Sequence, residues 1–129
     1  MKRSNREYQI CKEIAKYLKL QYPKVIFRFD MAGLSLSLAQ ASMNKAIQHG
    51  KGYPDLFISE PTGKYHGLYL EIKKEGERLT KKDGEPINEH INEQLDYLFA
   101  LQDKAYSADF AIGLDEAVNK INKYLSNGK

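Results

Sequence analysis

Two short segments of the chain carry residue types that could together hold a metal ion at a phosphodiester. Asp55 precedes the apolar run 56–58, and Glu71 and Lys73 lie at the end of the apolar run 68–72. Alternate residues of a strand share a face, so Glu71 and Lys73 are expected to point the same way. If the two strands pair, Asp55 can lie beside Glu71. Two adjacent carboxylates repel each other unless a cation lies between them, and their oxygens suit Mg²⁺ or Mn²⁺.

Each of these residues also has an ordinary structural interpretation. Pro54-Asp55 is a common turn pair, and Glu71 could lie at a strand end that is already in solvent. Lys73 could belong to the solvated charged run 73–75. We favour the chemical interpretation, because an acid in a central strand is costly to bury unless it is paired or bound to metal.

The elements that must position these residues follow from the spacing of the apolar side chains. Strands that alternate with helices along the chain favour a mixed sheet with helices on both faces. We expect helices at 5–20, 88–104 and 115–125 and strands at 24–30, 55–59, 67–73 and 109–113. Segment 36–48 could be helical, although its start alternates like a strand. The inward faces are expected to carry Tyr8, Cys11, Ile14, Ala15 and Leu18 in the first helix, and Ile91, Leu95, Leu98 and Phe99 in the second.

The composition is that of an ordinary folded protein. With 129 residues, 42% of them hydrophobic and 29% charged, the chain is expected to form a single domain over 1–129. The single cysteine, Cys11, excludes an internal disulfide and is expected to be a small core residue. No segment approaches the roughly 20 apolar residues of a membrane span, and the first residues lack the apolar run of a signal peptide. We therefore expect a cytoplasmic protein with no membrane partner.

The distribution of charge indicates a polyanionic partner more clearly than its total. The net charge of +3 permits a nucleic-acid partner without requiring one. Five cations, however, fall within ten residues beside the expected site: Lys73, Lys74, Arg78, Lys81 and Lys82. The three histidines, in contrast, are scattered, with no spacing typical of a zinc site: His49, His66 and His90.

On the expected αβββαβ order, Pro54-Asp55 followed by Glu71-x-Lys73 resembles the PD-(D/E)xK nuclease superfamily, with its restriction-endonuclease-like core. Further motifs are similar to the VRR-NUC (virus-type replication-repair nuclease) domain, namely Gly52-x-Pro54-Asp55-Leu56, Gln94 on the following helix and the strand-to-helix passage 108–117. The resemblance spans nearly the whole chain. The long charged segment 74–87 departs from compact relatives, which pass more directly into the helix.

The resemblance implies a Mg²⁺- or Mn²⁺-dependent endodeoxyribonuclease. Asp55, Glu71 and the backbone carbonyl of Ile72 would hold the metal, and Lys73 would orient the attacking water or stabilise charge on the phosphate. Gln94 would form hydrogen bonds near Lys73 or the phosphate, although the periodicity places it on the polar side of its helix, where an exposed glutamine is ordinary.

A further acid from the first helix often contacts the metal of such nucleases through water. Glu7 is the candidate here, with Glu13 as a weaker substitute. A structural role for Glu7 is equally plausible, because Ser4 and Glu7 match the capping box that begins many helices.

The same resemblance implies branched DNA, a four-way junction or a flap, as the substrate. A Holliday-junction resolvase-like homodimer, of the kind that serves recombination and repair, would bring two sites to one junction. The expected setting is the cytoplasm of a bacterial or phage-infected cell. Two alternatives remain open: a module that binds DNA junctions or ends without cutting, and a restriction-like duplex endonuclease. An apolar stretch could be core or a dimer face: Leu34, Leu36, Leu38 and Met43.

Overall fold

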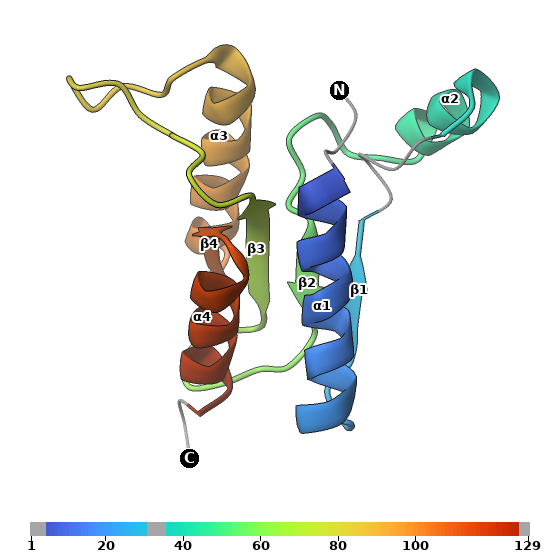
Figure 1. Ribbon diagram of the computed structural model, residues 1–129, viewed down its shortest axis with the longest axis vertical. Coiled ribbons are helices and arrows are strands. Elements are labelled where there is room, and N and C mark those ends of the chain that lie inside the picture. Colours follow the sequence, from blue (N-terminus) through green and yellow to red (C-terminus); the bar gives the residue numbers. More distant parts are fainter. Residues whose placement is uncertain (1–4, 31–35, 127–129) are drawn as a thin grey trace.

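The fold consists of a four-stranded sheet and four helices in the order expected from the sequence. The computed structural model describes residues 5–30 and 36–126 (Figure 1). In chain order the elements are α1 (Asn5–Gln21), β1 (Phe27–Phe29), α2 (Leu38–Ala46), β2 (Leu56–Ile58), β3 (Leu68–Lys73), α3 (Glu89–Asp103), β4 (Ser107–Ile112) and α4 (Leu114–Ser126). The expected α/β class and the αβββαβ core are confirmed, with α2 as an insertion between β1 and β2.

The sheet is mixed, with strand order β1-β2-β3-β4. The first three strands are antiparallel, whereas β4 runs parallel to β3 after the crossover through α3. Leu56 pairs with Leu70, so the register places Asp55, just before β2, opposite Glu71 of β3. Every residue of β3 is buried, which makes it the central strand of the fold.

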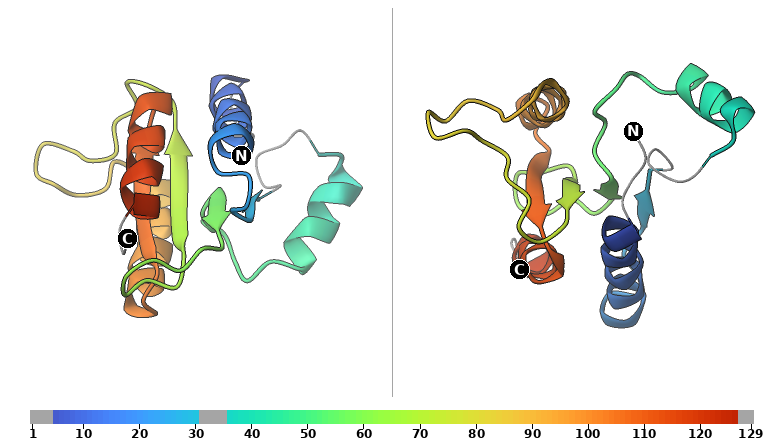
Figure 2. Two further views of the ribbon diagram at one scale, coloured as in Figure 1. Left: turned by 90° about the horizontal axis from the view of Figure 1, so that it is seen from below. Right: turned by 45° about the horizontal axis from the view of Figure 1, so that its top comes forward.

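Helices cover both faces of this sheet, and the two faces carry separate cores (Figure 2). Leu68, Leu70 and Ile72 pack with α1 and α4 in one core. Tyr69 belongs to the other core, beneath α3. Because strand side chains alternate, Glu71 and Lys73 lie on the same face as Tyr69, which is the α3 face.

The helix faces follow the predicted periodicity, except near the start of α1 and at Gln94 and Phe99 of α3. Cys11 is buried in the core, as expected. Tyr8 and Phe99, predicted to point inward, are 47% and 56% exposed. Ile10 takes the inward position near the start of α1, because the helix is rotated toward Ile10, Ile14 and Leu18. The expected Ser4–Glu7 capping box lies partly outside the described residues.

Helix α2 stands apart from the rest of the fold (Figure 1). A capping box begins it, since Gln40 N–H donates to Ser37 Oγ and Ser37 N–H donates to Gln40 Oε1. None of its residues is buried, so the core interpretation of this apolar stretch is wrong for Leu38 and Met43. Leu34 lies outside the described residues. Within the described chain, no helix has the length and apolar character needed to cross a membrane.

Candidate metal and phosphodiester site

Asp55 is fixed against β3 by its own carboxylate. Ile72 N–H donates to Asp55 Oδ2 at 2.7 Å. On the other side, the backbone carbonyl of Asp55 accepts the N–H of Asp30 at 2.7 Å, which continues the β1–β2 pairing by one residue. The side chain of Asp55 therefore occupies the end of the β2–β3 ladder, next to Glu71.

The backbone carbonyl of Ile72 faces the same side of β3 as Asp55. The N–H and C=O of one strand residue point toward the same neighbouring strand, and successive residues alternate. The C=O of Lys73 accepts the N–H of Gly113 at 2.8 Å, on the β4 side. The backbone groups of Ile72 consequently point to the β2 side, where Asp55 receives its N–H.

Four polar or charged side chains are buried in the described part of the chain, and all four were predicted as site residues. They are Asp55 (5% exposed), Glu71 (4%), Lys73 (5%) and Gln94 (4%). Burial of ionised groups costs several kcal/mol per ion unless other groups compensate. The interpretations of Glu71 as a solvated strand end and of Lys73 as part of a solvated run are therefore wrong.

The lysines at the end of β3 point in opposite directions. Lys73 is buried and forms an ion pair with Glu77, whose Oε2 lies 3.5 Å from Nζ. Lys74 is exposed, as expected, because it lies three positions after Glu71 and so points away from the face that carries Glu71. The alternation of the strand thus places a single cation, Lys73, on the face that carries both carboxylates.

Gln94 reaches the site from α3 together with a residue that the sequence analysis missed. Its Nε2 lies 3.3 Å from Nε2 of His90, one helical turn earlier. Its Oε1 is buried and has no hydrogen-bond partner among the described residues. Burial, followed by the positive charge of Lys73, lowers the pKa of His90 from its usual value of 6.5. The spacing of four residues from Gln94 was the signal that could have identified His90.

The loop that carries Asp55 packs directly on the helix that carries Gln94. Gly52 has a φ of +90°, and a Cβ at this position would lie 3.1 Å from the backbone of Glu93 and 3.2 Å from the N atom of Gln94. The glycine of the Gly52-x-Pro54-Asp55 motif is therefore needed for its backbone conformation and for its close approach to α3. The site is assembled from this loop, β3 and α3.

Glu7 lies in the first turn of α1, which begins at the same end of the fold (Figure 1). Its neighbour Arg6 donates from Nε to Glu75 Oε1 at 2.9 Å. The hydrogen bonds from Arg6 hold the pKa of the Glu75 carboxyl down at about 2. In the described residues, no three His, Cys, Asp or Glu side chains come together as a metal-binding set, so Glu7 does not complete one with Asp55 and Glu71. Its role through water stays a prediction, and Glu13 is exposed on α1.

The residues present fit a Mg²⁺ or Mn²⁺ ion. Mg²⁺ is commonly held by one or two carboxylates, with waters and substrate phosphates completing its shell. Asp55 and Glu71 supply two carboxylates on one face, and the Ile72 carbonyl points to the side on which Asp55 lies. Soft ligands are not part of this set, because the only cysteine is in the opposite core.

Comparison with known proteins identifies the fold. No family model and no curated protein matches the sequence. A solved structure described as a VRR_NUC domain protein is similar, with a TM-score of 0.68 and 23% sequence identity. The similarity covers 98% of this chain and 93% of that one. The resemblance inferred from the motifs is therefore confirmed at the level of the fold.

Proposed function

We propose, from a fold shared with a VRR_NUC domain protein, that this chain is a metal-dependent endodeoxyribonuclease. One observation carries the proposal: the buried polar residues of the described chain are two acids that the β2–β3 register sets opposite each other, a lysine two residues further on, and a glutamine on the helix against which the Asp55 loop packs. A structural role alone gives no reason to bury two carboxylates side by side, because each loses its hydration and repels the other.

Each residue has a role that its position supports. Asp55, Glu71 and the Ile72 carbonyl would hold Mg²⁺ or Mn²⁺. When bound, such an ion supplies Lewis-acid polarisation of a phosphate oxygen and a lowered pKa for a bound water. Lys73, held by Glu77, presents a fixed ammonium beside the acids, where it orients the attacking water or stabilises charge on the phosphate. Gln94 has a free amide oxygen to accept a hydrogen bond from that water.

We further propose that the substrate is branched DNA and that the active form is a homodimer. Helix α2 supports the dimer, because a nine-residue helix is too short to be stable alone. Met43 and the C-cap residue Ile47, four positions later, are large exposed apolar side chains on one face, which a second copy would cover. Two sites related by a twofold axis suit a four-way junction, in which two strands are cut symmetrically.

A cleavage assay tests the proposal. Labelled four-way junction, flap, single strand and duplex DNA are incubated with Mg²⁺, Mn²⁺ or EDTA, using the wild type and Glu71→Ala. We expect metal-dependent cleavage that the mutant lacks, with paired nicks on the junction. Cleavage of flaps or single strands alone would keep the nuclease and reject the resolvase. Binding of every substrate without any cleavage would instead identify a non-cutting DNA-binding module.

A further inference from the structure

The charged segment between β3 and α3 forms an ordered arm rather than an irregular loop. Thr80 and Pro86 form an isolated antiparallel bridge. Three hydrogen bonds hold the arm: Lys81 N–H to Glu85 O at 2.8 Å, Gly84 N–H to Lys81 O at 3.0 Å and Ile87 N–H to Leu79 O at 2.9 Å. The arm, residues 78–87, projects from the end of the fold at which β3 ends and α3 begins (Figure 1).

The base of the arm is anchored in the core beneath α3. Leu79 and Ile87, which pair across the base, both pack against the cluster that contains Ile91 and Leu98. These partly buried apolar side chains fix the direction in which the arm leaves the body. The polar residues toward its tip are therefore held at a defined position relative to α3.

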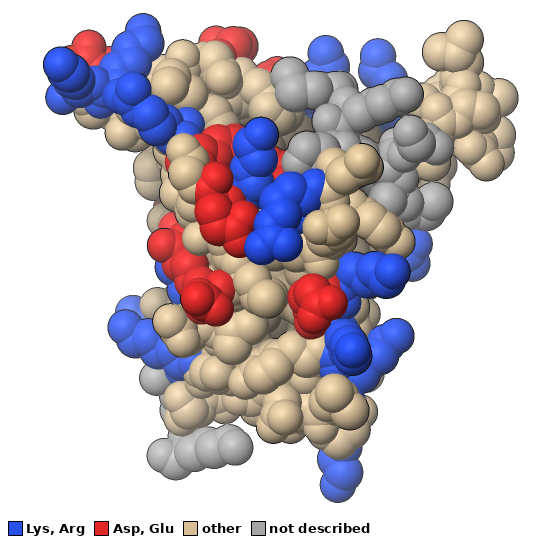
Figure 3. All heavy atoms as spheres, in the orientation of Figure 1, with Lys and Arg blue, Asp and Glu red and all other residues tan. Residues whose placement is uncertain are grey.

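Three cations of the arm have no internal partner. Arg78, Lys81 and Lys82 are exposed, and within the described residues none of them forms an ion pair. Positive side chains gather at the corner of the molecule where the arm projects (Figure 3). By contrast, Arg6, Lys73 and Lys120 are each paired with a carboxylate. These three cations outnumber the two acids of the arm, Asp83 and Glu85, so the arm carries a net positive charge in solvent.

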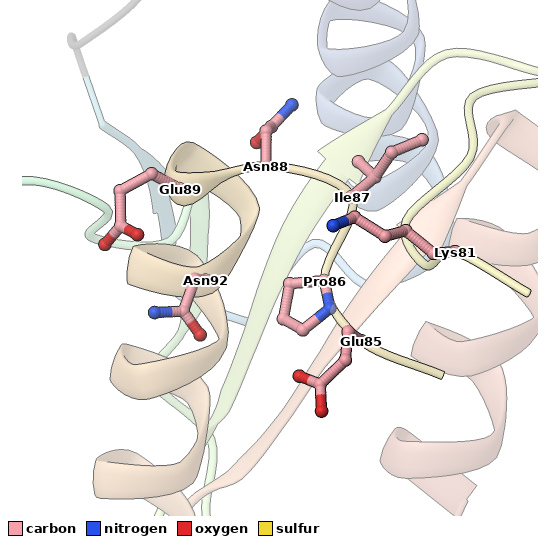
Figure 4. Close-up of a pocket in the computed structure, with 7 residues that line it drawn as sticks. All are labelled: Lys81, Glu85, Pro86, Ile87, Asn88, Glu89 and Asn92. Carbon is pink, nitrogen blue, oxygen red and sulfur yellow. The ribbon is translucent and has the colours of Figure 1, made fainter. Parts of the chain in front are cut away.

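A pocket of about 400 Å³ separates the arm from the first turns of α3 (Figure 4). Its lining includes Lys81, but also the carboxylates of Glu85 and Glu89. Two acids disfavour a phosphate inside the pocket. A polyanion would therefore first meet Arg78 and Lys82, which lie outside the pocket, with Lys81 at the pocket's edge.

Both ends of the arm are joined to the candidate site. It leaves β3 after Lys73, whose ion pair with Glu77 lies in the connecting turn. It rejoins the chain at the N-cap of α3, Asn88, two residues before His90. A strand bound with a phosphate beside Lys73 and running toward the start of α3 would pass next to the arm.

We propose that the arm is a phosphate clamp, which binds the nucleic-acid backbone beside the scissile phosphate. The inference rests on the proposed function, because it takes the ligand of the site to be DNA. Contacts from flexible cations to phosphates add affinity without reading the sequence. The arm therefore sets how tightly the substrate is held, whereas the residues of β3 and α3 perform the chemistry.

The test compares two triple variants that remove the same charge. Arg78→Ala, Lys81→Ala and Lys82→Ala together change the arm. Lys16→Ala, Lys19→Ala and Lys123→Ala together change exposed lysines toward the far ends of α1 and α4. Binding to labelled duplex and four-way junction is measured by fluorescence anisotropy in EDTA over a series of KCl concentrations, after thermal unfolding has shown that both variants fold.

We expect the arm variant to bind DNA roughly tenfold or more weakly than the wild type. Each lost phosphate contact reduces the magnitude of the slope of log K against log salt by about 0.9, so the loss of three contacts should reduce it by about 2 to 3. The control variant should keep the wild-type slope. Equal weakening of both variants, or unchanged binding by the arm variant, would overturn the clamp. The two proposals can fail separately. If DNA binding depends on the arm but the wild type cleaves no substrate, the clamp is kept and the nuclease is rejected. If the wild type cleaves DNA but binding does not depend on the arm, the nuclease is kept and the clamp is rejected.

Discussion

Ile72 donates its backbone N–H to the carboxylate of Asp55 at 2.7 Å, which joins the loop before β2 to the strand that carries Glu71 and Lys73. The bond places two acids from distant parts of the sequence side by side at the end of the sheet. The Ile72 carbonyl points to the same side, because the N–H and C=O of one strand residue face the same neighbouring strand. The pairing of β2 with β3 therefore organises all three groups that we propose as metal ligands.

Asp55→Asn should keep the fold and lose the response to metal. The amide oxygen of asparagine can still accept the Ile72 N–H, but its charge is gone. A ligand at one hundred times its Kd adds about 2.7 kcal/mol to the free energy of unfolding. We expect Mn²⁺ to raise the Tm of the wild type and of the exposed-site control Asp103→Asn, but not that of Asp55→Asn. Equal Mn²⁺ shifts in all three proteins would contradict the assignment.

Lys73→Met should abolish cleavage, whereas Lys74→Met should leave it near the wild-type rate. The two lysines are adjacent, but only Lys73 is buried on the face of the carboxylates. Loss of a fixed charge that stabilises a transition state costs about 10²-fold or more in rate. Single-turnover cleavage and binding in EDTA should be measured for both variants. Similar losses of rate in both would show that only the total charge matters.

His90 should make the protein less stable in mild acid. Because burial and the charge of Lys73 lower its pKa below 6.5, the unfolded chain takes up a proton at a higher pH than the folded chain does. The free energy of unfolding should therefore be fully maintained above pH 6.5 and fall as the pH drops toward the lower folded pKa. His90→Gln should show a smaller fall in urea unfolding over this range. An unchanged pH dependence would place the acid sensitivity elsewhere.

Gly52→Ala should damage the site more than an alanine at another glycine with positive φ. Gly63 also has a positive φ, +55°, but no atom lies within 4 Å of a Cβ added there. Gly63→Ala should therefore cost only the backbone strain, about 1 to 2 kcal/mol. Gly52→Ala must in addition push its loop from α3, so both stability and the Mn²⁺ response should fall. Equal losses in urea unfolding for the two variants would rule out the close approach as the cause.

Glutamate on α2 should break the proposed homodimer. Met43 of α2 and the C-cap residue Ile47 are 67% and 84% exposed, and α2 has no buried residue. Met43→Glu with Ile47→Glu should convert a dimer to a monomer in light scattering coupled to size exclusion. Phe99→Glu, at an exposed apolar residue of α3, serves as the control and should not change the mass. A wild type that is already monomeric would remove the dimer from the proposal while leaving the nuclease intact.

The sequence alone determined the order and type of the elements and most of the residues that we propose for the candidate site. That Glu71 and Lys73 share a face could be predicted because a strand has a period of two. That Asp55 lies opposite Glu71 depends on the pairing of β2 with β3. The bounds of α1, β3 and α3 are also close to those expected, because apolar spacing, caps and turn residues act over a few residues.

The tertiary structure decided what depends on packing between distant segments. The helical period alone placed Gln94 on a polar face and Phe99 inward, but the rotation of α3 over the sheet buries the first and exposes the second. His90 joined the candidate site only because the packing of α3 brings its ring within the influence of the charge of Lys73. Packing also decided the exposure of α2: its apolar residues Leu38 and Met43 could have been core by sequence, but no other element of the described chain covers them. Burial is a property of the assembled layers, whereas periodicity is a property of one segment.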